Sequence, residues 1–317
     1  MGKYLVSGGA GFIGSHITER LLKDGHFVRV FDNFSAGKME NLAFTKGLGK
    51  SKFELIKGDI RDKEACDKAC RGMEYVLFQS ALRSVPKSID DPLSYNEVNI
   101  NGTLFMLEAA KKWKIKRFVF ASSSSIYGEA KIFPEQEDHA PLLISPYALS
   151  KLTGEYYCRI FSALFSLETV CLRYFNVFGP RQSLDDEYAV VVPKFIHCLL
   201  HNEAPPIFGN GKQSRDFTYI DNVVSANLLS ATTPGLKHEI FNVANGKDNT
   251  VLELAMALNK ILGKNIKPKF LPKRAGDAFR TSADISRIRK KLKFKPLVSF
   301  EAGLALTVEY FKNKYSR

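Results

Sequence analysis

Three glycines near the start of the chain constrain its fold more than any other feature. Gly8, Gly11 and Gly14 follow a short apolar run at 4–7 and open a segment, 12–24, whose apolar residues recur at helical spacing. A glycine loop between a strand and a helix allows a tight turn and brings the backbone close to a pyrophosphate at the helix N-terminus. The loop therefore predicts a βαβ unit that binds a dinucleotide.

The first half of the chain repeats this alternation of short apolar strands and amphipathic helices. The predicted strands cover residues 4–7, 27–31, 53–57, 75–79, 117–122 and 169–174. The predicted helices cover residues 12–24, 63–70, 96–113 and 146–165. Because right-handed strand–helix crossovers build a parallel sheet, we expect an α/β fold, a doubly wound parallel sheet of the Rossmann type.

The regular alternation ends after Gly179 and Pro180, where prolines become frequent. We expect residues 1–176 to form the dinucleotide-binding domain, with about 217–236 returning to it. Residues 177–317 are expected to form a smaller, mixed α/β domain that binds the substrate.

An acidic residue at the end of the second predicted strand indicates which dinucleotide binds. Asp32 lies 18 residues after Gly14. A carboxylate there accepts hydrogen bonds from the adenosine ribose hydroxyls and repels a 2′-phosphate. Because Asn33 follows it, and not an arginine that would bind a 2′-phosphate, the sequence favours NAD over NADP.

A tyrosine, a lysine and a serine form the candidate catalytic set. Tyr147 and Lys151 are four residues apart on a predicted helix and so share one face. A nearby ammonium stabilises a phenolate and is expected to lower the tyrosine pKa, which suits a general base. Ser123 lies at the end of the fifth predicted strand, where such sheets bind ligands. A YxxxK pair alone is common, but its combination with the glycine loop, Asp32 and Ser123 predicts an active site.

Composition and charge exclude several other classes of protein. The chain has 46 Lys and Arg against 33 Asp and Glu, but these charges are spread out without aromatics spaced for base stacking, so no nucleic-acid partner is predicted. Five cysteines without a secretion signal predict no disulfide framework, and Cys66 and Cys70 lack the second pair that a zinc site needs. No apolar run approaches about 20 residues, so we expect no membrane segment and a cytoplasmic location.

Six motifs make the chain resemble the extended short-chain dehydrogenase/reductase family over nearly its whole length. They are GGAGFIG (8–14), ASSSSIYG (121–128), SPYALSK (145–151), RYFNVFGPRQ (173–182), SRDFTYID (214–221) and RAGD (274–277). Within that family the chain is most similar to the UDP-hexose 4-epimerases, above all to those acting on UDP-N-acetylglucosamine. The resemblance implies NAD as cofactor, a UDP-sugar bound by residues 177–317, and a homodimer formed through residues 96–113 and 146–166. The apolar faces expected there consist of Leu104, Leu107, Ala110, Leu149, Leu152 and Tyr156.

The resemblance also implies roles for individual residues. Tyr147 is expected to be the catalytic base, Lys151 to orient it, and Ser123 to complete the catalytic set. Residues implied in cofactor binding are Gly8, Gly11, Phe12, Ile13, Gly14, Asp32, Asn33, Ser35, Gly37, Asp59, Ile60, Gln79, Ala81, Asn99, Ser122, Tyr147, Lys151 and Tyr174. Residues implied in substrate binding are Ser84, Ser123, Ser124, Tyr147, Asn176, Val191, Arg215, Arg274, Asp277 and Thr281, the two arginines clamping the diphosphate.

The serines at 123–125 narrow the set of possible reactions. Dehydratases that resemble this chain carry Thr-Asp-Glu at Ser123, Ser124 and Ser125, and the related decarboxylases keep a Glu at Ser125. Without those acids only oxidation and re-reduction at C4 remain, which is 4-epimerisation through a transient 4-keto sugar. A UDP-glucuronate 4-epimerase remains the alternative, and a non-catalytic NAD-binding scaffold is a more distant one.

Two positions bear on substrate and cofactor contacts. Thr281 stands where a large tyrosine excludes an N-acetyl group in the epimerases that it resembles, so the small side chain predicts UDP-GlcNAc and UDP-GalNAc as substrates. UDP-Glc and UDP-Gal stay open as a second pair. Phe78 departs from the family's usual His and is expected to remove a polar group near the cofactor.

Overall fold

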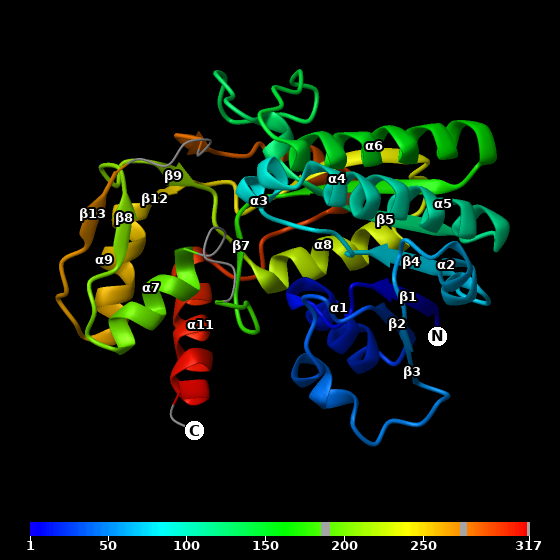
Figure 1. Cartoon of the computed structure of the whole chain (residues 1–317), viewed down its shortest axis with the longest axis horizontal. Coiled ribbons are helices and arrows are strands. Elements are labelled where there is room, and N and C mark those ends of the chain that lie inside the picture. The colour runs from blue at the N-terminus through cyan, green and yellow to red at the C-terminus, as the bar shows by residue number, and fades with distance from the viewer. Residues whose placement is uncertain (185–190, 273–277, 316–317) are drawn as a thin grey trace.

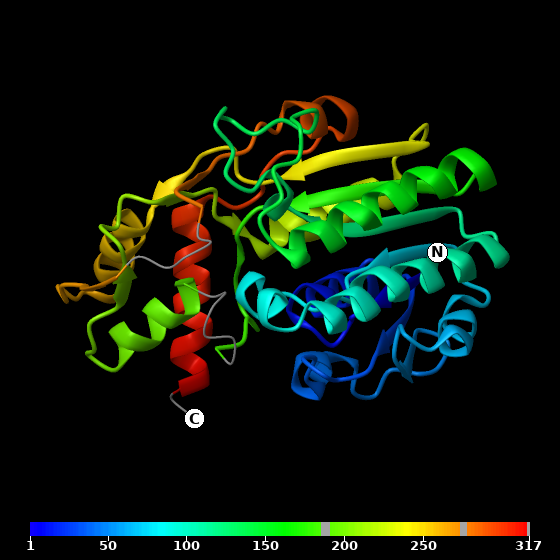
Figure 2. The ribbon, with the colours of Figure 1, turned by 45° about the horizontal axis from the view of Figure 1, so that its top comes forward.

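The computed structural model describes residues 1–184, 191–272 and 278–315 and shows two lobes (Figures 1 and 2). The larger lobe is built on a seven-stranded sheet in the order β11-β6-β5-β4-β1-β2-β3, and all of its pairings are parallel. Its strands are β1 (Lys3–Ser7), β2 (Phe27–Asp32), β3 (Phe53–Lys57), β4 (Tyr75–Phe78), β5 (Arg117–Ser123), β6 (Glu168–Tyr174) and β11 (His238–Val243). This confirms the predicted doubly wound α/β fold.

Helices cover both faces of this sheet because alternate strand residues point to opposite sides. One face packs against α1 (Phe12–Lys23) and α8 (Ile220–Thr232) through side chains such as Leu77 and Val119. The other face packs against α2 (Lys63–Cys70), α5 (Gly102–Lys112) and α6 (Pro146–Phe165). Figure 1 shows α5 and α6 side by side on that second face.

Phe78 belongs to the core of the second face. It is 1% exposed, and its ring centroid lies 5.5 Å from that of Phe118 and 6.1 Å from that of Phe120. Its side chain therefore packs in the core, and its effect on the cofactor contacts stays a prediction. A phenylalanine buried this completely contributes about 2–3 kcal/mol to stability.

A segment after residue 176 returns to the larger lobe, and it is longer than the sequence predicted. After residue 176 the helix α8 packs against α1 and the sheet, and β11 then pairs with β6 at the edge of the sheet. The returning segment therefore extends beyond residue 236, because β11 lies at residues 238–243. β11 thus forms the edge of the sheet beyond β6.

The described part of the smaller lobe consists of short strands and three helices. Its strands are β7 (Val177–Phe178), β8 (Pro206–Phe208), β9 (Ser214–Arg215), β10 (Thr218–Tyr219), β12 (Asn249–Thr250), β13 (Lys269–Leu271) and β14 (Arg280–Thr281). Its described helices are α7 (Val191–Leu200), α9 (Val251–Leu262) and α11 (Phe300–Tyr315), while α10 (Ser286–Leu292) packs against β11 and α8 of the larger lobe. Among the described residues, no helix combines the length and the apolar composition that a bilayer crossing requires.

The predicted helix at 96–113 has a different form in the structure. Residues Asn96–Asn101 form a π-helical turn, and the regular helix α5 begins only at Gly102. Two further short helices, α3 (Val85–Asp90) and α4 (Pro92–Tyr95), precede it. Apolar periodicity does not distinguish a π turn from an α turn, because both place side chains on nearly the same face.

Candidate active site

A cavity of about 1000 Å³ lies at the carboxyl ends of the parallel strands, where the strand order reverses between β1 and β4. Ligands bind at this position in open α/β sheets. Most of the predicted site residues line the cavity. They are Gly8, Gly11, Phe12, Ile13, Gly14, Asp32, Asn33, Ser35, Gly37, Ile60, Gln79, Ala81, Ser84, Ser122, Ser123, Ser124, Tyr147, Lys151, Tyr174, Asn176, Arg215 and Thr281.

The glycine loop is shaped to accept a phosphate. Gly11 is the N-cap of α1, and no described side chain caps its free N–H groups. A Cβ on Gly14 would lie 2.1 Å from the Gly8 carbonyl oxygen, so the helix can approach the loop this closely only because residue 14 is glycine. Gly8 has φ +72, in the left-handed region that glycine adopts readily. The residues present therefore fit the pyrophosphate of a dinucleotide.

Asp32 lies at the end of β2, on the same rim of the cavity. Its carboxylate accepts hydrogen bonds from the backbone N–H of Ala10 (2.9 Å) and of Phe34 (2.8 Å), which fix its orientation. Burial raises the pKa of Asp32, and the two N–H donors oppose that effect. Each carboxylate oxygen keeps a further lone pair, so the side chain can also accept ribose hydroxyls.

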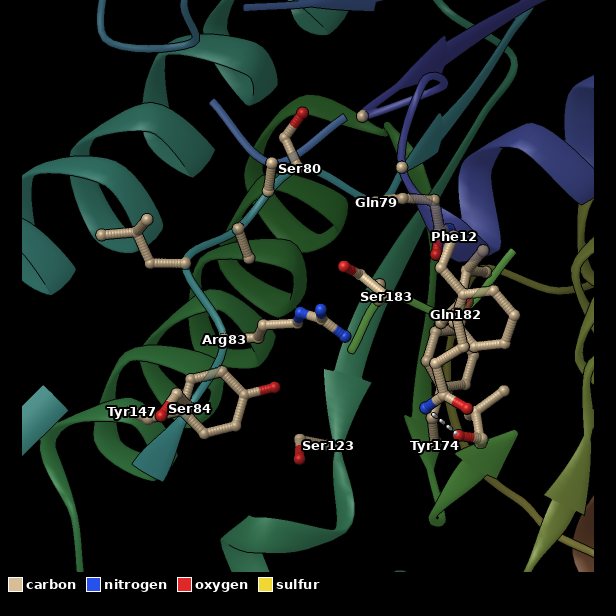
Figure 3. Close-up of a pocket in the computed structure, with 18 of the residues that line it drawn as sticks. Phe12, Gln79, Ser80, Arg83, Ser84, Ser123, Tyr147, Tyr174, Gln182 and Ser183 are labelled. Carbon is tan, nitrogen blue, oxygen red and sulfur yellow. Dashed lines mark hydrogen bonds between the residues drawn. The ribbon is translucent and has the colours of Figure 1, made fainter. Parts of the chain in front are cut away.

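The Ser–Tyr–Lys set lies deeper in the cavity. Figure 3 shows the Tyr147 hydroxyl pointing into the cavity, with Ser123 opposite it at the end of β5. Burial raises the pKa of Tyr147, while a hydrogen bond with Ser123 and the charge of Arg83 lower it. Ser145 caps α6 by accepting from Ala148 N (3.2 Å), so the helix start that carries Tyr147 is well defined.

Lys151 shares the helix α6 with Tyr147, and its expected effect on the Tyr147 pKa stays a prediction. Its Nζ donates to the Ala121 carbonyl at 2.8 Å and lies 5.9 Å from the centre of the Tyr147 ring. Burial lowers the pKa of Lys151 to about 7, so near neutral pH its amine carries only part of a charge. The effect of Arg83 on the Tyr147 pKa is one that the sequence pattern did not predict.

The wall opposite the glycine loop carries Thr281. Its hydroxyl accepts from the Asn176 side-chain amide at 3.0 Å, and β14 pairs Thr281 with Arg215 of β9. Two buried acidic residues contact this wall through hydrogen bonds. Glu135 accepts from Ser282 N at 2.6 Å, and Asp216 donates its own N–H to the Thr281 carbonyl at 3.0 Å.

These two carboxylates make the stability of the wall depend on pH. Burial, together with a smaller effect of the Asp216 charge, raises the pKa of Glu135 to about 7, and burial raises the pKa of Asp216 to about 7 as well. An unfolded Glu titrates near about 4.3. Since the folded state holds its protons to higher pH, these groups stabilise the fold most at low pH and lose that contribution as pH rises from about 4.3 to about 7.

Glu135→Gln should therefore stabilise the protein at alkaline pH. We expect its Tm to match the parent's near pH 5 and to exceed it by about 3–6 °C near pH 8, because the neutral amide needs no proton. Calorimetry at both pH values measures this, with the exposed acid Glu309→Gln as control. A Tm difference that is the same at both pH values would contradict the titration of Glu135.

Some predicted site residues lie outside the cavity lining. The Asp59 carboxylate pairs with Arg61 (2.9 Å) and accepts from Asn33, and these contacts hold its pKa far below its usual range. Asn99 is buried and supports the loop after β4, donating to Leu82 O (3.0 Å) and accepting from Leu82 N (2.8 Å). Val191 begins α7 and does not line the cavity. Arg274 and Asp277 lie outside the described residues.

The cavity also contains arginines that the sequence analysis did not select. Arg83 follows β4 by five residues, and a cation just beyond a strand end was the available signal. Arg181, in the motif RYFNVFGPRQ, has φ +65 and turns back to pair with Glu19 of α1. Its guanidinium also lies 5.1 Å from the Phe44 ring, so it ties the start of the smaller lobe to the first helix.

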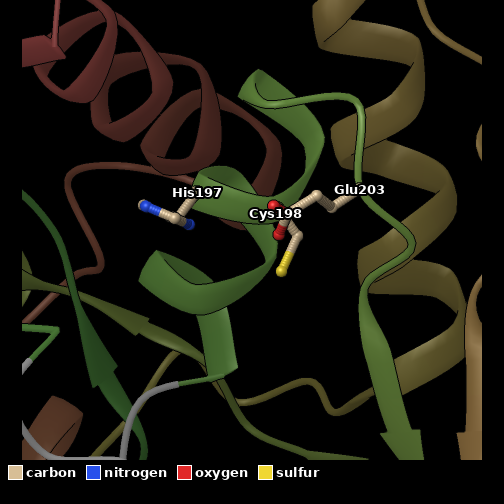
Figure 4. A group of neighbouring side chains, drawn as sticks. All are labelled: His197, Cys198 and Glu203. Atoms are coloured by element: carbon tan, nitrogen blue, oxygen red, sulfur yellow. The ribbon is translucent and has the colours of Figure 1, made fainter.

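A separate group of potential metal ligands lies in the smaller lobe, on and just after α7 (Figure 4). Ligand atoms of His197, Cys198 and Glu203 lie within 4.8 Å of one another. Cys198 is buried, Glu203 is exposed, and the His197 ring lies tilted against that of His201 with centroids 4.3 Å apart. None of the three lines the active-site cavity.

Comparison with known proteins identifies the family. The model of the NAD dependent epimerase/dehydratase family matches residues 4–244, most of the chain. The chain belongs to the NAD dependent epimerase/dehydratase family. Membership confirms the resemblance seen in the sequence motifs and the predicted cofactor, NAD.

Solved structures of this family are similar over the full length. A UDP-N-acetylglucosamine 4-epimerase of Methanobrevibacter ruminantium, in complex with UDP-N-acetylmuramic acid, is 41% identical with a TM-score of 0.93, and the match covers 99% of each chain. A UDP-glucose 4-epimerase of Thermotoga maritima with UDP-glucose is 39% identical with a TM-score of 0.92, again over 99% of each chain. A UDP-glucuronic acid 4-epimerase of Bacillus cereus, with UDP-glucuronic acid and NAD, is 34% identical with a TM-score of 0.91 over 99% of this chain and 100% of that one.

Proposed function

We propose that this NAD-dependent UDP-sugar 4-epimerase, an isomerase, interconverts UDP-GlcNAc and UDP-GalNAc. One observation carries the proposal: Tyr147 and Ser123 face each other in a cavity that is continuous with the glycine loop and Asp32. The full-length similarity to three 4-epimerases supports the reaction.

The chain's own residues account for the binding and the proton transfer. The N–H groups at the start of α1 would hold the pyrophosphate and Asp32 the adenosine ribose. When bound, NAD supplies the hydride acceptor for oxidation at C4 and the donor for the return. Tyr147 takes the proton of the 4-hydroxyl as a general base, and Ser123 shares a hydrogen bond with the reacting oxygen.

Inversion requires that the 4-keto sugar present its other face before Tyr147 returns the proton. We propose that Asn176 and Arg215, with Arg274 outside the described residues, hold the diphosphate while the sugar turns. Of these, Asn176 and Arg215 line the cavity beside Thr281. Ser124 and Ser125 carry no acid that could eliminate water, so the keto sugar has only re-reduction open to it.

The small side chain of Thr281 supports the proposed preference for the acetylated substrates. Its short side chain, held by Asn176 at 3.0 Å, leaves the wall of the sugar cavity free of a bulky ring. Thr281→Tyr should reduce kcat/KM for the acetylated pair by at least about tenfold, through loss of space, and change it less for UDP-Glc and UDP-Gal. Thr281→Ser, which keeps the hydroxyl, is the matched control. Equal losses on both pairs would contradict the role of residue 281.

We expect the two lobes to bind different molecules. We propose that residues 1–176, α8 and β11 bind NAD, and that the remaining part of 177–317 binds the UDP-sugar. The direct test offers UDP-GlcNAc, UDP-Glc and UDP-GlcA separately and detects the 4-epimer of each by chromatography. Conversion of UDP-GlcA alone would replace the proposed substrate by the uronate, and conversion of none would reject 4-epimerisation.

We further propose that the chain forms a homodimer through α6. Leu149, Tyr156, Ile160 and Leu164 are 51%, 52%, 47% and 70% exposed and form one stripe at helical spacing. Exposed apolar surface of this kind is typical of interfaces. Leu107, Ala110 and Leu152, expected in the interface from the sequence, are instead buried in the core of the same chain. Sedimentation of the purified protein measures its mass, and a monomer would reject the dimer.

A further inference from the structure

A buried ion pair lies next to the end of β5, outside the lining of the catalytic cavity. Glu155 of α6 and Arg173 of β6 are both buried, and the guanidinium donates to both carboxylate oxygens. Arg173 Nε lies 2.9 Å from Glu155 Oε1, and its Nη2 lies 2.7 Å from Oε2. Two charge-assisted hydrogen bonds of this kind fix the orientation of both side chains. Since neither residue lines the cavity, an effect on the reaction must pass through their neighbours.

The carboxylate of this pair also holds the end of β5. Ser122 donates its hydroxyl to Glu155 Oε1 at 2.6 Å. One turn earlier on α6, Lys151 donates to the carbonyl of Ala121 at 2.8 Å, so two side chains of one helix contact two successive residues of the strand. The next residue is Ser123, which faces the catalytic tyrosine across the cavity (Figure 3). The strand is therefore joined to α6 immediately before the serine.

The guanidinium of the pair contacts the chain on the other side of Ser123. Arg173 Nη1 donates to the Tyr127 hydroxyl at 2.9 Å, and that hydroxyl donates to Asn242 Oδ1 at 2.6 Å. Tyr127 is the last residue of the short helix η3 (Ser124–Tyr127), which begins directly after Ser123. The ion pair is thus linked through side chains to the chain before and after the serine.

We propose that Glu155 and Arg173 are positioning residues, which keep the Ser123 hydroxyl in place opposite the catalytic base. The inference rests on the proposed function of Ser123 and Tyr147 and adds two residues to it. Glu155 and Tyr147 are carried by the same helix, so the hydrogen bond from Ser122 joins the element that bears the base to the strand that bears the serine. A displacement of about 1 Å at a reacting group can cost about a hundredfold in rate, so support of this kind matters to the reaction.

The first test is Ser122→Ala, which removes the 2.6 Å hydrogen bond and leaves the ion pair intact. We expect kcat to fall about ten- to hundredfold, with KM and the amount of bound NAD within about twofold of the parent. Glu155→Gln, whose amide has one acceptor oxygen instead of two, should show a similar loss. The double variant should lose no more than the larger single one, because both changes break the same link. A purely structural pair would lower Tm without this coupling in kcat.

The matched control is the ion pair at the other end of the same strand. Arg117 begins β5 and pairs with Glu168 of β6 at 2.7 Å. Glu168→Gln breaks that pair at the end of β5 far from Ser123, so it should lower Tm but leave kcat unchanged. Equal kcat losses from Glu168→Gln and Glu155→Gln would overturn the proposal, because they would reflect a general loosening of the strand.

Crystal structures of the NAD-loaded parent and of Ser122→Ala give a measurement that needs no sugar. We expect the Ser123 hydroxyl oxygen to move by about 0.5 Å or more relative to that of Tyr147. An unmoved serine, or a Ser122→Ala variant with the parent's kcat, would overturn the proposal, as would a loss of NAD alone, since Ser122 would then be a cofactor contact. If Glu155→Gln does not fold, Ser122→Ala decides by itself. A parent that converts no UDP-sugar would reject the proposed function, while the two crystal structures would still decide the positioning role.

Discussion

Tyr147→Phe is expected to lower kcat by about a thousandfold or more. Removing the hydroxyl takes away the group that accepts the 4-hydroxyl proton, and general acid–base catalysis contributes about 10²–10⁴ in rate. The ring itself stays, so its edge-to-face contact with Tyr95 is kept and the fold should not change. Turnover of UDP-GlcNAc by the purified variant measures the effect.

The matched control for this variant lies on the same helix. Tyr156→Phe removes a hydroxyl from α6 at a position that is 52% exposed, and it should leave kcat unchanged. NAD released on denaturation should be equal in the parent and in both variants, because the glycine loop and Asp32 are untouched. Normal turnover by Tyr147→Phe would reject its role as base.

Gly14→Ala is expected to abolish NAD binding and to lower stability by more than about 3 kcal/mol. The added Cβ would lie 2.1 Å from the Gly8 carbonyl oxygen and 2.8 Å from the Gly9 Cα. Both are backbone atoms of a tight turn, so neither can move without displacing the start of α1. NAD titration and thermal unfolding measure the two effects.

Gly11→Ala is the graded control for this prediction. Its Cβ would meet the same Gly8 oxygen at 3.2 Å, a contact that a small shift of the loop can relieve. We expect it to change the Tm much less than Gly14→Ala. If Gly14→Ala keeps both its Tm and its NAD, the close packing of helix against loop is not what the third glycine provides.

Local pattern was sufficient for most of the larger lobe. Alternation of short apolar runs with helical spacing predicted six of the seven strands of the parallel sheet within a residue or two, because each crossover unit is built from neighbouring segments. The seventh, β11, was missed because it follows residue 179, where the regular alternation ends, and because polar residues interrupt its apolar run. The local sequence of a strand does not identify the strand with which it pairs.

Some residues of the candidate site were likewise predicted from local sequence, while the roles of others depend on packing. Gly8, Gly14 and Asp32 line the cavity because strand ends and a loop place them there within one βαβ unit. Asn99 was expected to contact the cofactor, but its side-chain amide makes hydrogen bonds with the backbone of the loop after β4. Phe78 follows the pleat of β4 to the far face of the sheet. These two outcomes depend on which way a side chain points after packing.

Spacing along the chain thus established the parallel sheet, the dinucleotide loop and the shared helix face of Tyr147 and Lys151, because these depend on residues within one or two structural units. Only the folded molecule established the buried ion pair of Glu155 and Arg173 and its links to both sides of Ser123. The two side chains meet because α6 packs on β5 and β6. Electrostatic effects depend on distance and on exclusion of water, and neither is encoded in separation along the sequence.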